Sequence, residues 1–237
     1  MLGRLSELSI STSDILDSWN FYTRLGFTTT SSADIWPYRY SVVTDGRLSL
    51  GLHENNLSGV VLTYVLPDIN QHFLSFKKQG IVFELEQLGD QRFNELLFRS
   101  PDGTCIRLIE APTYSQLTPD AISLLGWFEQ PLMASHNLKA ATRFWENLQF
   151  VSMPEEHLPV SHIPLINDAI SLGLHTARGW ANETLWFRVH DISDVRGKLR
   201  SRDIAVNNPL PPGLDPAHHV MLRAPEGTQL LLSSMSE

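Results

Sequence analysis

The chain contains an internal repeat that spans most of its length. Three segments recur in the same order, each displaced by 122 to 124 residues: Phe21–Phe27 as Phe144–Phe150, Leu48–His53 as Ile170–His175, and Arg99–Thr104 as Arg223–Thr228. An ordered repeat of this length predicts two copies of one structural module, since each copy supplies the same packing surfaces. We therefore expect a first module over residues 1–112, a linker over 113–122 containing proline, serine and threonine, and a second module over 123–237.

Local patterns predict both strands and helices inside each module. Polar and apolar residues alternate from Glu7 to Ser11, the period of a half-buried strand. Ser13-Asp14 then supplies a helix N-cap signal, and apolar residues recur at helical spacing until Gly26 ends the helix. Asp45-Gly46 predicts a tight hairpin between strands 38–44 and 47–53.

The same order begins again inside the module. We expect a strand over 61–66, a helix over 69–79, and strands over 93–99 and 105–109. Each half then contains two strand-helix-strand units, so the whole chain contains four. The predicted fold class is α+β.

Two of these segments resemble a known superfamily. Ser18–Phe27 resembles the helix signature of the vicinal-oxygen-chelate superfamily, and Phe98–Thr104 resembles its final hairpin. That superfamily includes glyoxalases, bleomycin-resistance proteins, extradiol dioxygenases and fosfomycin-resistance enzymes. The resemblance implies four βαβββ units, paired into two open, cup-shaped mixed sheets with helices on the outside. It does not specify a reaction, because one fold can carry many activities.

The resemblance also implies where metal ligands would stand. Its enzymes place them early in the first strand of a unit and four residues after the glycine of the last hairpin. In this chain those positions hold Glu7, Val61 and Arg107 in the first half, and Gln130, Thr184 and Leu231 in the second. A divalent site needs three or four His, Asp, Glu or Cys ligands around one point. We therefore expect no metal and no cofactor.

Arg107 suggests what replaced the ion. If the two ligand positions converge, Glu7 and Arg107 are expected to form a salt bridge where the metal would have been. Arg107 could instead hold a carboxylate or phosphate of a ligand. In some four-unit relatives the first unit pairs with the fourth, and Arg107 would then meet Gln130.

Strand alternation identifies the residues that face each cup, because neighbouring side chains point to opposite faces. The candidate ligand-binding residues are Glu7, His53, Glu95, Arg99 and Arg107 in the first cup, and Gln130, His175, Trp186, His219 and Arg223 in the second. The first cup is expected to be ionic and the second more apolar and aromatic. Structural roles are also open: Glu95 and Arg99 could pair with cross-strand neighbours, Trp186 could be core packing, and the Trp36–Tyr38 segment could be a lid or part of the core.

Composition excludes several functions. The formal net charge is -8 and no run of Lys or Arg occurs, so we expect no nucleic-acid partner. The single cysteine, Cys105, cannot form an intrachain disulfide or a cysteine-based zinc site. The N-terminus does not have the pattern of a signal peptide, and no apolar run approaches the roughly 18 residues of a membrane span. We expect a cytoplasmic protein with no membrane partner.

Three functional hypotheses follow. The first is a metal-free protein of the glyoxalase or bleomycin-resistance type that binds a small organic molecule, with or without side-chain acid/base chemistry. The second is a metal-dependent lyase or dioxygenase whose ligands have moved, for example to Glu7, His53 and Glu95. The third is an interaction module with vestigial cups. Whether the chain is an enzyme stays open, and a homodimer is compatible with all three hypotheses.

Overall fold

The computed structural model describes residues 2–30, 36–89, 93–110, 123–177, 180, 183–206 and 208–235. The expected linker, residues 113–122, lies outside them.

The described part of the first half forms one mixed sheet with two helices. Its elements in chain order are β1 (Arg4–Ser11), α1 (Ile15–Arg24), β2 (Thr28–Thr30), β3 (Tyr40–Thr44), β4 (Ser49–His53), β5 (Val60–Val65), α2 (Ile69–Lys78), β6 (Phe83–Gln87), β7 (Glu95–Arg99) and β8 (Cys105–Ile109). The strands lie in the order β2-β3-β4-β1-β5-β8-β7-β6. The two short edge strands β2 and β6 are absent from the sequence prediction.

The second half repeats this plan. Its elements are β9 (Trp127–Ser135), α3 (Leu138–Asn147), β10 (Val151–Ser152), β11 (Ile163–Ile166), β12 (Ser171–Thr176), β13 (Thr184–Val189), α4 (Ile192–Ser201), β14 (His219–Arg223) and β15 (Gln229–Ser234). Their order in the sheet is β10-β11-β12-β9-β13-β15-β14. The α+β class and the paired βαβββ units are confirmed, although the fourth unit has only βαββ in its described residues.

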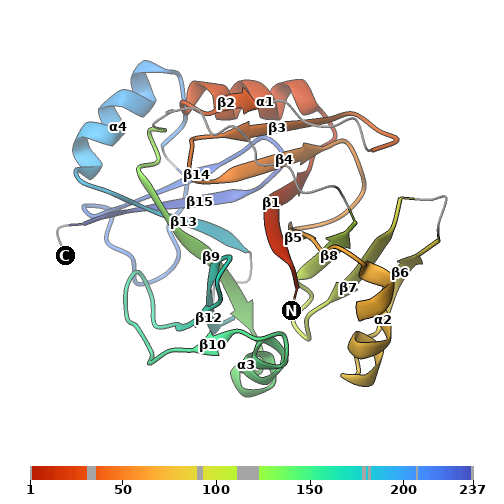
Figure 1. Ribbon diagram of the computed structural model, residues 1–237. Coiled ribbons are helices and arrows are strands. Elements are labelled where there is room, and N and C mark those ends of the chain that lie inside the picture. Colours follow the sequence, from red (N-terminus) through yellow and green to blue (C-terminus); the bar gives the residue numbers. More distant parts are fainter. Residues whose placement is uncertain are drawn as a thin grey trace.

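The first strands of neighbouring units join the units into cups. β1 pairs antiparallel with β5, and β9 pairs antiparallel with β13. The first unit therefore pairs with the second, and the third with the fourth. Figure 1 shows the two sheets, with α1 and α4 along one side of the molecule and α2 and α3 along the opposite side.

Local signals explain where the elements begin and turn. The Asp14 carboxylate caps α1 by accepting hydrogen bonds from the backbone N–H groups of Leu16 and Asp17, at 3.0 and 3.1 Å. Gly46 has φ of 86° in the β3–β4 turn, where a side chain would be strained. Both signals were predicted from the sequence.

The two faces of each sheet have different cores. Apolar residues on the helix side of both sheets form one continuous cluster that includes Leu8, Tyr22, Trp145 and Phe187. Residues whose side chains point to the opposite, cup-facing side form separate small clusters, such as Val61, Leu97 and Cys105. The separate clusters confirm that alternate residues of these strands point to opposite faces of the sheet. None of the described helices is long and apolar enough to cross a bilayer.

Candidate functional site

Three polar residues lie in one row across the centre of the first cup. In the strand register Glu7 of β1 faces Thr63 of β5, and Thr63 faces Arg107 of β8. The sequence suggested Val61 for the middle ligand position. Val61 lies two residues before Thr63 on β5 and faces Ser9 of β1. Thr63 therefore separates Glu7 from Arg107.

The Glu7 side chain turns away from Arg107 and lies over Gly51 of the neighbouring strand β4. A Cβ atom at position 51 would lie only 2.1 Å from Glu7 Oε1, so any larger residue there would force the carboxylate out of this position. In this position Glu7 Oε1 lies 2.7 Å from His53 Nε2 and accepts a hydrogen bond from Ser9 Oγ at 2.6 Å. Glu7 Oε2 accepts a hydrogen bond from the Tyr40 hydroxyl at 2.6 Å. The carboxylate is 3% exposed and has three donors.

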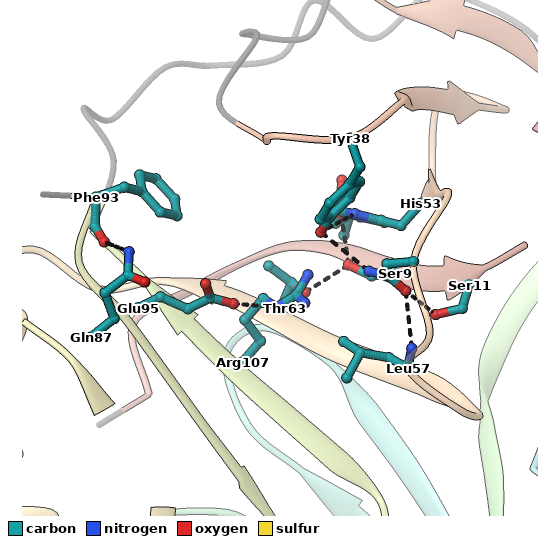
Figure 2. Close-up of polar contacts among 12 residues, drawn as sticks. Ser9, Ser11, Tyr38, His53, Leu57, Thr63, Gln87, Phe93, Glu95 and Arg107 are labelled. Carbon is teal, nitrogen blue, oxygen red and sulfur yellow. Dashed lines mark hydrogen bonds and ion pairs between the residues drawn. The ribbon is translucent and has the colours of Figure 1, made fainter. Parts of the chain in front are cut away.

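A chain of hydrogen bonds leads from the rim of the cup to Glu7. Asn55 Nδ2 donates to the Tyr38 hydroxyl at 3.1 Å, which leaves the Tyr38 proton for His53 Nδ1 at 3.2 Å. His53 then donates from Nε2 to Glu7, because a ring nitrogen that accepts leaves the other to donate. Figure 2 shows Tyr38 above His53, with Thr63 between this group and the Glu95–Arg107 pair.

The environment of Glu7 favours its charged form. Burial raises the pKa of the carboxyl group, but the hydrogen bond and electrostatic interaction with His53, together with the hydrogen bonds from Ser9 and Tyr40, outweigh this effect. The pKa therefore lies below the usual Glu value of 4.5.

Arg107 pairs with Glu95 instead of Glu7, so the expected Glu7–Arg107 salt bridge is wrong. Arg107 Nε lies 2.9 Å from Glu95 Oε1. The N–H does not point at that oxygen, however, and neither Nε nor Nη1 has a hydrogen-bond partner among the described residues. We therefore regard the contact as an ion pair without a directed hydrogen bond. Burial raises the pKa of Glu95, and the electrostatic interactions with Arg107 and His53 only partly offset this.

An aromatic side chain covers these charges. The guanidinium carbon of Arg107 lies 4.6 Å from the centre of the Trp36 ring, and Tyr38 stacks on Trp36 at an interplanar angle of 13°. His53 and Phe93 contact Trp36 edge to face. Trp36 is 8% exposed, and its Nε1 is buried without a hydrogen-bond partner in the part of the chain that the structure describes. The residue thus both covers the cup and belongs to its packing.

The second cup has the same plan with different side chains. Gln130 faces Trp186, and Trp186 faces Leu231, so two apolar residues replace Thr63 and Arg107. The Gln130 side chain lies near Gly173, as Glu7 lies over Gly51. It contacts His162 Nε2 at 2.7 Å and accepts from Ser171 Oγ at 2.7 Å.

Apolar side chains fill the second cup. Leu132, Trp180, Trp186, Leu214, Met221 and Leu231 form one buried cluster. Trp186 Nε1 is satisfied by Ser233 Oγ at 3.0 Å, so this residue is core packing. The expected apolar and aromatic character is confirmed.

Two histidines complete the wall of the second cup. His175, the counterpart of His53, donates from Nδ1 to the Thr176 carbonyl at 3.0 Å, and its Nε2 has no hydrogen-bond partner among the described residues. Burial lowers the pKa of His175. His219 donates from Nδ1 to the Asp215 carbonyl at 3.0 Å. Among the residues that the structure describes, no carboxylate stands opposite His175 as Glu7 stands opposite His53.

The two remaining candidates, Arg99 and Arg223, lie at the ends of the last hairpins and line a cavity between the two halves. Arg99 bonds Glu84 at 3.0 Å and the Gly103 carbonyl at 2.9 Å, so it pairs with a cross-strand neighbour and braces its hairpin.

The residues at the ligand positions that the resemblance implies do not fit a metal ion. Arg107 stands at one of them in the first cup, and in the second cup the strand register places Trp186, instead of the expected Thr184, between Gln130 and Leu231. The alternative set fails for a different reason: Glu7 and His53 meet, but Glu95 is held by Arg107. Within the described ranges, no group of three His, Cys, Asp or Glu side chains is arranged to hold a metal.

Tyr40 of the first cup and His162 of the second were not among the candidate ligand-binding residues, and Tyr38 was expected only as part of a lid or of the core. Tyr40 lies two residues before Val42, which faces Gly51, and His162 lies two residues before Pro164, which faces Gly173. The two are equivalent, and each bonds the polar residue of its first strand. Alternation along strand 38–44 was the signal that could have identified Tyr40.

Comparison with known proteins finds a similar fold among solved structures only. No protein-family model matches the chain. No curated protein matches it either. Among solved structures, a catechol 2,3-dioxygenase aligns over 99% of this chain and 90% of its own, with 15% identity and a TM-score of 0.61. A variant of homoprotocatechuate 2,3-dioxygenase from Brevibacterium fuscum aligns over 98% of this chain and 71% of its own, with 13% identity and a TM-score of 0.65.

An extradiol ring-cleaving dioxygenase from B. fuscum gives 13% identity and a TM-score of 0.66. At these identities the likeness establishes the fold. The chain has the two-module fold of the extradiol dioxygenases, as the resemblance to the vicinal-oxygen-chelate superfamily implied.

Proposed function

From the fold that it shares with extradiol dioxygenases, we propose that this protein binds a small organic molecule in the first cup without a metal ion. The nearest model is the bleomycin-resistance type, in which binding itself is the function. The ligand carries an acidic group that Arg107 receives.

The unused hydrogen-bonding capacity of Arg107 carries the proposal. A buried guanidinium is costly unless it is paired and hydrogen-bonded. Arg107 is 4% exposed, and two of its nitrogens donate no hydrogen bond to a described residue. The planar donor fork of arginine suits a carboxylate or phosphate. A ligand oxyanion would supply the hydrogen bonds that Glu95 does not.

The contrast between the cups supports the choice of the first. Small-molecule sites combine apolar walls with a few convergent polar groups. The first cup has such a wall in Trp36, Val61 and Leu97, with Arg107 and the Glu7–His53 pair beside it. The second cup is filled by its own apolar cluster.

The hydrogen-bond chain favours a second candidate, proton transfer to a bound substrate. Tyr38 is the half-buried end of the chain, and it could accept a substrate proton while passing its own to His53 Nδ1. Glu7 would stabilise the resulting imidazolium from the other side of the ring. Under this candidate Tyr38→Phe would abolish turnover and preserve binding, whereas loss of both would point to a structural role.

A binding screen with paired variants tests the main proposal. Small carboxylates, phosphates and neutral aromatic compounds are screened by thermal shift and measured by calorimetry. The test variant is Glu95→Gln with Arg107→Gln, which removes both charges together and leaves neither one buried alone. The matched control is Glu129→Gln with Arg188→Gln, a half-exposed pair in the second module with a 3.9 Å separation.

We expect an acidic compound to bind the wild type, with affinity reduced at least about tenfold in the test variant and unchanged in the control. The proposal is refuted if no compound binds, or if both double variants bind equally well.

A further inference from the structure

A cavity of about 440 Å³ lies between the two modules, outside both cups. Both copies of the repeated hairpin motif contribute to its wall, with Arg99, Gly103 and Thr104 from one copy and Arg223, Gly227 and Thr228 from the other. The repeat detected in the sequence therefore brings the same groups to one cavity from two sides. Its volume lies within the range of small-molecule sites.

The carboxylates of this wall already have donors. Glu226 accepts hydrogen bonds from Ser18 Oγ and the Tyr22 hydroxyl, both at 2.8 Å. Glu183 accepts from the backbone N–H of Val60 at 2.7 Å. In both cases a carboxylate of the second module is held by donors of the first, so these acids fasten the modules together.

The third acid of the wall is also engaged. Asp102 Oδ1 accepts from the backbone N–H of His136 at 3.2 Å, again across the two modules. The three carboxylates therefore form hydrogen bonds between the two modules, and these bonds explain their presence without a cationic ligand.

The two guanidinium groups of this wall have N–H donors that make no hydrogen bond to a described residue. Arg99 uses Nε and Nη1 for Glu84 and the Gly103 carbonyl. The Arg223 side chain, which lines the cavity, makes no hydrogen bond or ion pair with any residue in the described ranges. A Cβ atom at Gly103 would meet open space, so the hairpin leaves room beside these groups.

We propose that this cavity binds a small oxyanion, a carboxylate or a phosphate, which bridges the modules through Arg223 and Arg99. Guanidinium groups form paired, charge-assisted hydrogen bonds with both kinds of oxyanion. The three neighbouring carboxylates limit the site to a ligand of low negative charge. The site is separate from the first cup, so it does not depend on the proposed function.

Thermal unfolding with defined anions tests the proposal on the full chain. Sodium phosphate and sodium acetate are titrated in the millimolar range against sodium chloride at matched ionic strength, because phosphate also stabilises proteins non-specifically at high concentration. The test variants are Arg223→Gln and Arg223→Lys. The control is Arg200→Gln, which removes an exposed cation from α4 of the same module.

We expect saturable stabilisation of the wild type by at least one of the two anions, and the tighter binder identifies carboxylate or phosphate as the preferred chemistry. Affinity falls about tenfold or more in Arg223→Gln, falls less in Arg223→Lys, and is unchanged in Arg200→Gln. Absence of saturable stabilisation, or an equal loss in Arg223→Gln and Arg200→Gln, overturns the proposal.

Discussion

Glu7 Oε1 and His53 Nε2 lie 2.7 Å apart in the centre of the first cup, both almost fully buried. This contact joins the first strand of a unit to its last strand across a glycine. The remaining oxygen of Glu7 is bonded to Tyr40, so the carboxylate is held from three directions. The pair replaces the Glu7–Arg107 contact that the sequence suggested.

Removing the carboxylate should be costly. Glu7→Ala would leave the donors of Ser9, Tyr40 and His53 buried without their acceptor. We expect a loss of about 3–5 kcal/mol in the free energy of unfolding. Urea denaturation measures it. Glu86→Ala, which removes an ion pair with Lys77 between two half-exposed side chains, should cost no more than about 1 kcal/mol. Equal costs would contradict the account.

The contribution of Glu7 should depend on pH. The pKa of Glu7 is lowered in the folded protein, so the unfolded chain takes up its proton first as the solution is acidified. The stabilisation is therefore complete above the ordinary value of 4.5 and is lost as the pH falls through the lower folded value. The difference in melting temperature between wild type and Glu7→Gln should shrink below pH 4.5. A difference that grew on acidification would show that the pKa is raised.

Gly51 should be required for this arrangement. The Cβ of Gly51→Ala would occupy the space of the Glu7 carboxylate, 2.1 Å from Oε1. We expect a destabilisation of about 1–3 kcal/mol together with loss of the pH effect. Gly197→Ala is the control, since no atom lies within 4 Å of its Cβ and the residue is inside α4. That substitution should stabilise the protein by about 0.5–1 kcal/mol. Tolerance of alanine at position 51 would mean that Glu7 can move at little cost.

Arg107 and Glu95 should behave as a coupled pair. Arg107→Met leaves the Glu95 carboxylate in a buried position without its countercharge, and we expect a loss of about 3–5 kcal/mol. Adding Glu95→Gln to the same protein should recover most of that loss. A double-mutant cycle by chemical denaturation gives the coupling energy. Additive effects would show that the two side chains do not interact.

Much of the fold could be predicted because its signals are local. The Asp14 cap and the Asp45-Gly46 turn act within a few residues. Because the sequence repeats, a helix or strand predicted in one half could also be predicted for the equivalent residues of the other half. The edge strand β6 could not be predicted in this way. Its central residues Glu84, Leu85 and Glu86 are all exposed, so burial does not alternate along the strand.

The alternation of side chains along each strand predicted which residues face the cup, but it did not predict which of them contact one another. Alternation correctly placed Glu7, His53, Glu95 and Arg107 on the cup face. Which of these side chains contact one another depends on the register between strands and on the direction in which each side chain extends. The register places Thr63 between Glu7 and Arg107. The absence of a side chain at Gly51 lets the Glu7 side chain extend toward His53. Neither effect has a signature within one strand.

Native mass spectrometry of freshly purified protein, combined with elemental analysis, tests the central claim most directly. The account predicts that the folded chain carries no stoichiometric transition metal and that any retained mass belongs to a small organic acid. That mass should be absent from the Glu95→Gln, Arg107→Gln variant and present in the Glu129→Gln, Arg188→Gln control. A stoichiometric nickel, zinc, iron or manganese ion in the wild-type protein would contradict the account.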